Sequence, residues 1–179
     1  MSKLILRPII SAEDRETFIS EIQEAFQIAY EKEFGKFEKT ILPAKDIEES
    51  FETEGSEAYI AEIDGVRVGG TIIAIDDKTG YNSLHLLYVK SGLQNAGNGF
   101  KIWQLIEALH PETKIWETHT PYYDKRNIHF YVNRCGFRIV EFFNPRHKDP
   151  QQASDTAGNI PIENNYFFRF EKVMKETAL

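Results

Sequence analysis

The residues Gln94–Gly99 form a glycine-rich run between an apolar stretch that ends at Val89 and an amphipathic stretch that begins near Phe100. A glycine-rich turn that opens a helix directs several free backbone N–H groups at one place, where an anion can bind. No aspartate or glutamate occurs in residues 78–106, although the chain carries 28 acidic residues in 179. This acid-free window predicts a site for a negatively charged ligand.

Two familiar phosphate-binding loops are excluded by their residues. A Walker-type loop requires two glycines five residues apart, followed by Lys and Ser or Thr. Gly92 and Gly97 have that spacing, but Asn98 and Gly99 follow them. A dinucleotide-binding fingerprint requires a third glycine three residues after Gly99, where this chain has Ile102.

Hydrophobic periodicity and turn residues predict the elements that position this run. Ser11 and Asp14 have the spacing of a helix capping box, and Asp64 with Gly65 suits a tight hairpin turn. We expect strands at 4–9, 58–63, 66–76, 83–89, 114–120, 137–143 and 166–174, and helices at 11–33, about 43–51, 100–109 and 124–134. The order β-α-α-β-β-β-α-β-α-β-β describes an α/β (mixed α+β) fold, with helices on both faces of a central mixed sheet.

Composition narrows the class of protein. A chain of 179 residues with 41% hydrophobic residues fits one domain over residues 1–179 with its own core. The formal charge of −7 argues against binding to nucleic acid or anionic membranes. The single cysteine, Cys135, excludes an intrachain disulfide, and no targeting segment is apparent, so we expect a cytoplasmic location.

Gln94, Gly97 and Gly99 fit a third loop pattern, namely Gln or Arg, two residues, Gly, one residue, then Gly or Ala. Here the chain resembles the GNAT superfamily of acyl-CoA-dependent N-acetyltransferases. Upstream, Leu87 and Val89 stand where that family has Leu and Val on its motif strand. The resemblance continues downstream at Phe130, Tyr131, Gly136 and Phe137 and extends to the order of the elements.

The resemblance implies acetyl-CoA as a co-substrate, with its pyrophosphate at the loop and its pantetheine arm along the splayed end of the motif strand. The residues that it assigns to this donor are Leu87, Tyr88, Val89, Gln94, Asn95, Ala96, Gly97, Asn98, Gly99, Phe100 and Asn127. It also implies direct attack of a neutral amine on the thioester carbonyl, which needs a general base and a proton donor for the leaving thiolate.

Candidates for these two roles are few. Tyr131 is implied as the proton donor, but four residues separate it from Gly136 where the family usually has three, so that it could instead pack in the core. His85, Glu117 and His119 are candidate bases, although each could equally be an ordinary strand residue. Their spacing does not indicate a metal site, so none is expected.

The acceptor is defined less well than the donor. Acidic residues dominate between Glu13 and Asp64, which could form a funnel for a cationic amine or simply be solvated helix faces. We expect a small-molecule or peptide amine as acceptor and no nucleic-acid or membrane partner, and an exposed final strand would make a homodimer reasonable. The alternative function is a non-catalytic acyl-CoA-binding module of the same fold.

Overall fold

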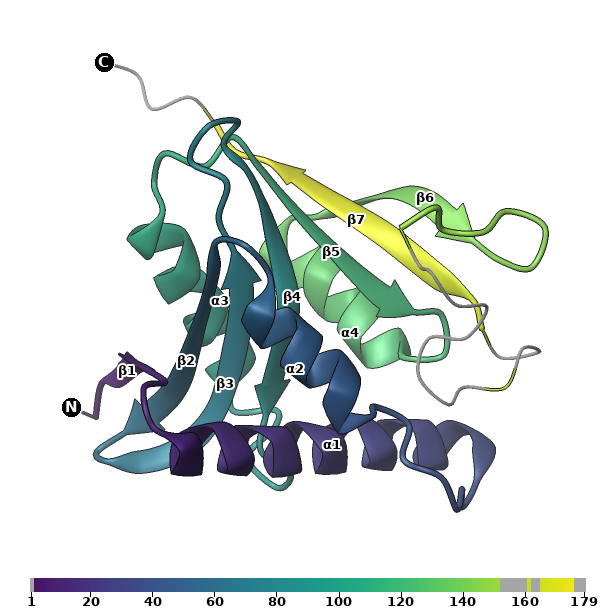
Figure 1. Ribbon diagram of the computed structural model, residues 1–179, viewed down its shortest axis with the longest axis horizontal. Helices are drawn as coiled ribbons and strands as arrows, with labels where there is room; N and C mark the ends of the chain where they lie inside the picture. Colours follow the sequence, from purple (N-terminus) through teal and green to yellow (C-terminus); the bar gives the residue numbers. More distant parts are fainter. Residues whose placement is uncertain (1, 152–160, 162–164, 176–179) are drawn as a thin grey trace.

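The computed structural model describes residues 2–151, 161 and 165–175 of the chain, and its elements follow the predicted order (Figure 1). The strands are β1 (Leu4–Pro8), β2 (Ser56–Ile63), β3 (Val66–Ala74), β4 (Tyr81–Val89), β5 (Ile115–Pro121), β6 (Arg138–Phe143) and β7 (Phe167–Val173). The helices are α1 (Ala12–Phe34), α2 (Ala44–Glu52), α3 (Asn98–Leu109), α4 (Lys125–His129) and the π-helix η1 (Phe130–Cys135). None of the helices in these described ranges is long and apolar enough to cross a membrane.

The seven strands form one sheet in the order β1-β2-β3-β4-β5-β7-β6. All neighbouring pairs are antiparallel except β4 and β5, which are parallel. The expectation that the final strand is exposed was wrong, because β7 lies between β5 and β6 and is paired on both sides. Instead β6 forms the edge at this end of the sheet, where Ile139, Val140 and Phe142 are exposed.

Helices cover both faces of the sheet, and each face has its own core. On one face, Phe18 and Ile22 of α1 and Ile47 of α2 pack against Ile72 and Tyr88 of the sheet. On the other face, α3 and η1 pack against a larger cluster that contains Trp103, Trp116, Tyr131, Phe137 and Phe170. The two layers confirm the mixed α/β architecture expected from the element order.

Local signals in the sequence account for several element ends. The Ser11 hydroxyl accepts a hydrogen bond from the Asp14 backbone N–H at 3.1 Å, as the capping box predicted. Asp64 and Gly65 have φ angles of 51° and 77°, the left-handed conformation that a two-residue hairpin turn requires.

The side of α1 that faces the sheet is held by polar contacts as well as by packing. The Asp14 carboxylate accepts hydrogen bonds from Arg7 at 2.7 Å and Arg67 at 3.0 Å. Further along the helix, the Glu21 carboxylate accepts one from the Tyr88 hydroxyl at 2.6 Å and lies 3.1 Å from the Lys90 ammonium. These contacts fix α1 beside the carboxyl end of β4.

The close approach of α1 to the sheet gives a test of this packing. A Cβ atom at Gly70 would lie 2.7 Å from the Phe18 ring, well inside van der Waals contact. We expect Gly70→Ala to lower the free energy of unfolding by about 1–3 kcal/mol through overpacking, measured by urea denaturation. The double variant with Phe18→Leu should be more stable than additivity predicts, because the smaller side chain makes room. Strict additivity would contradict this explanation.

Candidate functional site

The strands β4 and β5 separate partway along their length. They pair only from Tyr81 with Ile115 to Leu84 with Thr118. Beyond this point β4 stays paired with β3 as far as Val89, whereas β5 stays paired with β7 as far as Pro121. The side of residues 85–89 that faces β5 therefore has no strand partner, and its backbone groups face a wedge-shaped gap.

An irregularity in β4 lies where the two strands part. Ile72 of β3 pairs with Leu86 and Ile73 pairs with Leu84, so His85 is an extra residue in the ladder. Such a bulge bends a strand and re-aims its side chains, and bulges are common next to active sites. The bulge thus places His85 at the closed end of the gap.

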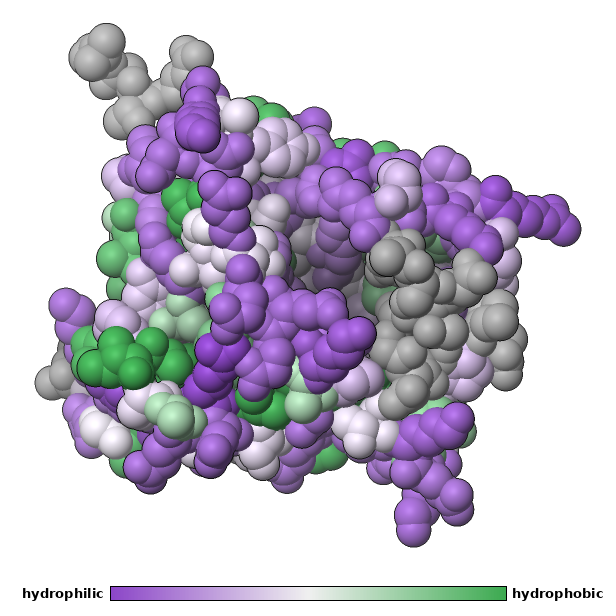
Figure 2. All heavy atoms as spheres, in the orientation of Figure 1, coloured by the Kyte–Doolittle hydropathy of each residue, from purple (hydrophilic) through white to green (hydrophobic). Residues whose placement is uncertain are grey.

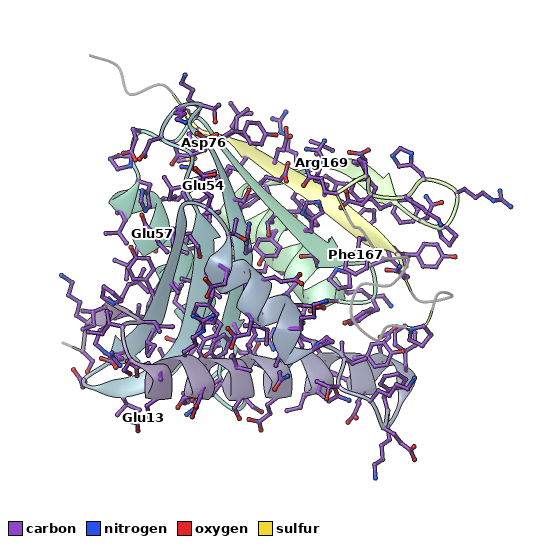
Figure 3. All side chains as sticks on the ribbon, viewed as in Figure 1. Glu13, Glu54, Glu57, Asp76, Phe167 and Arg169 are labelled. Carbon is purple, nitrogen blue, oxygen red and sulfur yellow. The ribbon has the colours of Figure 1, made fainter. Side chains whose placement is uncertain are left out.

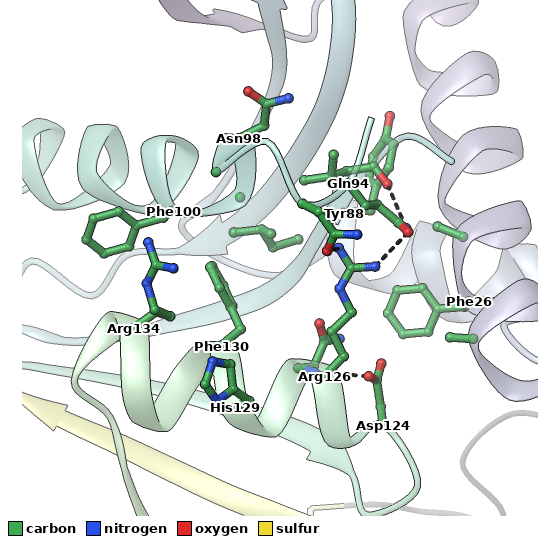
Figure 4. A pocket seen from close by; sticks show the side chains of 18 residues that line it. Phe26, Tyr88, Gln94, Asn98, Phe100, Asp124, Arg126, His129, Phe130 and Arg134 are labelled. Atoms are coloured by element: carbon green, nitrogen blue, oxygen red, sulfur yellow. Dashed lines mark hydrogen bonds between the residues drawn. The ribbon is translucent and has the colours of Figure 1, made fainter. Parts of the chain in front are cut away.

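A pocket of about 350 Å³ opens at the wide end of this gap (Figure 4). Its walls come from α1, β4, the glycine-rich loop, the start of α3, α4 and η1. The lining residues are Ala25, Phe26, Ala29, Leu87, Tyr88, Val89, Gln94, Asn95, Gly97, Asn98, Gly99, Phe100, Asp124, Arg126, Asn127, His129, Phe130 and Arg134. Of the residues assigned to the donor from the sequence, all except Ala96 line this one pocket.

The glycine-rich loop turns sharply into α3. Asn95 and Gly97 both have positive φ angles, 69° and 76°, and Gly97 is the N-cap residue of the helix. The Asn98 side-chain amide donates to the Leu93 carbonyl at 3.2 Å, which closes the loop on itself. The N–H groups of the first helical turn have no partner within the helix, and that turn contains no acidic residue. This arrangement suits an anion.

The charges that line the pocket are unlike those of the whole chain. Two arginines, Arg126 and Arg134, and a single carboxylate, Asp124, line the pocket in a protein of net charge −7. Asp124 caps α4 by accepting a hydrogen bond from the Asn127 backbone N–H at 3.0 Å. Burial raises the pKa of the Asp124 carboxyl, while that hydrogen bond and the Arg126 charge oppose the rise. The pocket is thus the electropositive region that the acid-free window indicated.

Tyr131 does not line the pocket. The extra residue between it and Gly136 is absorbed by the π-helical turn η1, and the Phe137 N–H donates to the Tyr131 carbonyl at 2.9 Å. The Tyr131 ring is 5% exposed and packs against Phe137 and Phe170. Burial raises its pKa, and the nearby Thr118 side chain, where β4 and β5 part, opposes the rise. Its neighbour Phe130 lines the pocket instead.

The three candidate bases lie outside the pocket lining. Glu117 and His119 alternate with the core residue Trp116, so they lie on the sheet face that carries α1 and α2. The Glu117 carboxylate accepts a hydrogen bond from Arg169 at 3.0 Å. The His119 ring stacks on Phe143, with centroids 6.0 Å apart, and its Nε2 lies 3.7 Å from an Asp149 carboxylate oxygen.

The surroundings lower the pKa of both imidazoles near the gap. Burial lowers the pKa of His85, and the nearby His119 lowers it further. Burial also lowers the pKa of His119, although Glu117 and Asp149 oppose that effect. Within the described ranges, no group of three His, Cys, Asp or Glu residues is arranged to hold a metal ion.

The acidic residues of the first two helices are partly used within the fold. Asp14 pairs with Arg7 and Arg67, and Arg15 pairs with Glu48 and Glu52. Figure 3 shows Glu13 on the outer side of α1. In the same view Glu54 and Glu57 lie beyond the C-terminal end of α2. The labelled carboxylates therefore do not converge on one place.

Several lining residues were not predicted, because no local pattern marks them. Phe26 reaches the pocket from α1, and Arg126 and Arg134 reach it from α4 and η1. Arg126 donates hydrogen bonds to Gln94 Oε1 at 2.7 Å and Asn95 Oδ1 at 3.0 Å, across 32 and 31 residues of sequence. One residue in the sequence could have indicated these arginines. Asp124 is the N-cap of α4, the helix that carries Arg126 and continues to Arg134.

Comparisons with known proteins agree with this fold. The model of the Acetyltransferase (GNAT) family matches residues 19–137. The chain is 42% identical over 177 residues to the uncharacterized protein YrkN of Bacillus subtilis (strain 168), which covers 97% of this chain and 95% of that protein.

Solved structures of low identity share the fold. A Bacillus subtilis acetyltransferase in complex with CoA is 17% identical, with a TM-score of 0.64 over 98% of this chain and all of the other. A GNAT family acetyltransferase from Elizabethkingia anophelis with acetyl-CoA bound is 14% identical, with a TM-score of 0.64 over 96% and 98% of the two chains. The strands β4 and β5 part as the resemblance implied. Because the matched family model spans most of the chain, this protein belongs to the GNAT acetyltransferase family.

Proposed function

We propose that this protein is an N-acetyltransferase that transfers an acetyl group from acetyl-CoA to a primary amine. One observation carries the proposal: the glycine-rich loop, the unpaired edge of β4 and two arginines all line one pocket. A loop of this shape suits the pyrophosphate, and the apolar side chains of Phe26, Leu87 and Phe130 suit the pantetheine arm. Two structural neighbours, named as complexes with CoA and acetyl-CoA, support the same donor.

The gap between β4 and β5 suits the thioester end of the donor. Backbone N–H groups of β4 that have no strand partner can donate hydrogen bonds to the carbonyl oxygen, where negative charge develops during attack. The amine nitrogen forms a bond to the carbonyl carbon, the carbon–sulfur bond breaks, and the thiolate takes up a proton. The products are an amide and free CoA.

Among the candidate bases we favour His85. It is the bulged residue at the closed end of the gap, and its lowered pKa keeps the imidazole neutral and able to accept a proton at pH 7. One Glu117 carboxylate oxygen accepts a hydrogen bond from Arg169, and His119 contacts Phe143 and Asp149. These contacts make Glu117 and His119 less suited to receive the proton.

We retain Tyr131 as the proton donor to the thiolate. Its raised pKa keeps the hydroxyl protonated, and Tyr131 lies near Thr118, whose Oγ1 donates to the Leu84 carbonyl where β4 and β5 separate. A hydroxyl at the closed end of the gap can meet sulfur without lining the wider pocket.

The acceptor is proposed to enter from the face that carries α1 and α2. Figure 2 shows a hollow with hydrophilic walls on this face, over the sheet between α2 and β7. The sheet carries three candidate bases on this side, namely His85, Glu117 and His119. An amine that enters here would pass them on its way to the gap. Either a small molecule or a peptide amine fits an opening of this kind.

The burial of Tyr131 favours one alternative, an acyl-CoA-binding module without catalysis. If Tyr131 serves only the core, no proton donor for the thiolate remains among the residues named above. Binding and turnover separate the two functions.

We expect millimolar acetyl-CoA to raise the melting temperature, because a ligand that binds only the folded state stabilises it. Thiol release across a panel of amines then tests catalysis. Turnover with any acceptor supports the enzyme, and binding without turnover supports the module. The absence of a thermal shift would contradict both.

Two glycine variants test the loop assignment. Gly97 and Gly92 both have positive φ, and a Cβ atom at either position would meet nothing within 4 Å, but only Gly97 lines the pocket. We expect Gly97→Glu to weaken acetyl-CoA binding about 100-fold or more in calorimetry, since juxtaposed like charges cost several kcal/mol. Gly92→Glu carries the same charge and backbone strain, so its affinity should match the wild type. Equal affinities in the two variants would refute the assignment.

The choice of His85 predicts a specific pH dependence. The neutral imidazole is the active form, so kcat/KM should fall as pH drops through its lowered pKa, below 6.5. His85→Gln should lower kcat by about 10²- to 10⁴-fold and remove this acidic limb. His119→Gln should keep the limb and move it toward higher pH, because His119 lowers the His85 pKa. If only His119→Gln loses the acidic limb of the pH profile, His119 rather than His85 is the base.

A further inference from the structure

The glycine-rich loop contains no charged residue, since Gln94–Gly99 reads Gln-Asn-Ala-Gly-Asn-Gly. A guanidinium bound to this loop comes from a different element. Arg126 of α4 donates one hydrogen bond to Gln94 Oε1 at 2.7 Å and another to Asn95 Oδ1 at 3.0 Å. A single planar cation therefore holds two consecutive loop side chains.

These contacts act on the part of the loop with unusual backbone geometry. Asn95 has a φ of 69°, and outside the glycines only Asp64 shares a positive φ among the described residues. Asparagine tolerates this conformation better than most residues, but the conformation still costs free energy. The Arg126 bond to the Asn95 side chain opposes its return to extended backbone. Gln94 is held at its other end as well, because its Nε2 donates to the Val89 carbonyl at 3.5 Å.

The two arginines of the pocket have different surroundings. Arg134 lies over the Phe100 ring, with its Cζ 5.3 Å from the centroid, on the α3 side of the pocket. Figure 4 shows Arg126 directed toward Gln94, on the opposite side of the pocket from Arg134. Arg126 is thus the pocket arginine that contacts the side chains of the loop directly.

We propose that Arg126 is a positioning residue for the donor, which shapes the loop and supplies the positive charge that the loop lacks. This inference rests on the proposed function, because it concerns how the same pocket selects its donor. A guanidinium beside the loop favours the diphosphate of acetyl-CoA and does nothing for a thioester that carries no phosphate. Arg126 therefore makes the site specific for phosphate-bearing donors.

The test compares two donors and three variants. The donors are acetyl-CoA and S-acetylpantetheine, which has the same thioester but no phosphate. The variants are Arg126→Gln, Arg126→Lys and Lys125→Gln. Lys125 is a matched control, because it is adjacent on the same helix and its ammonium contacts Glu33 at 3.4 Å rather than the loop.

We expect Arg126→Gln to raise KM and Kd for acetyl-CoA about 10- to 100-fold, the range of a charge-assisted hydrogen bond, with kcat changed less than about twofold. Its constants for S-acetylpantetheine should equal those of the wild type. Arg126→Lys should recover part of the affinity for acetyl-CoA, and Lys125→Gln should resemble the wild type with both donors.

The outcomes separate this inference from the proposed function. If the wild type does not bind acetyl-CoA, the proposed function fails and the inference fails with it. If the wild type binds and Arg126→Gln binds equally well, only the inference is overturned. An equal loss with both donors also overturns it, because a merely structural role for Arg126 would not distinguish them.

Discussion

The separation of β4 from β5 is the constraint on which the rest of the site depends. A parallel pair that continued to Val89 would use its backbone groups in the ladder and leave no gap for a ligand. β4 stays paired with β3, and β5 stays paired with β7. The strands β4 and β5 therefore separate without loss of hydrogen bonds to these other neighbours. The pocket, the bulge at His85 and the convergence of α1 and α4 all lie along this one gap.

Electrostatics follow from the same arrangement. An acidic chain that binds an anion must keep its carboxylates away from the gap or pair them. The window without acids covers β4, the loop and most of α3, while Asp14 and Glu21 on α1 are engaged by groups from the sheet. The ion pairs that hold α1 in place therefore also compensate the charges of these two carboxylates.

The sequence indicated those parts of the site that are local in the chain. Gln94–Gly99 could be interpreted because a strand, a turn and a helix follow one another directly, and the hairpin at Asp64 and Gly65 follows from residues that tolerate positive φ. The contribution of Arg126 could not be predicted, because it depends on the packing of α4 against a loop about 30 residues away. The position of β7 within the sheet was missed for the same reason, since strand composition does not encode neighbour order. The roles of His85 and Tyr131 stay predictions, because they depend on where the sulfur and the amine lie in the gap.

The π-helical turn explains how one short segment serves both the core and the pocket. Side chains four residues apart share a face here: Phe130 and Arg134 line the pocket, whereas Tyr131 and Cys135 are buried in the core. The extra residue before Gly136 would otherwise shift Gly136 and Phe137, and with them the start of β6, relative to Tyr131. By widening one turn, the chain keeps Phe137 in the core and the Tyr131 hydroxyl beside Thr118. Because α4 continues directly into this turn, the position of Arg126 at the loop is tied to the packing of Tyr131 in the core.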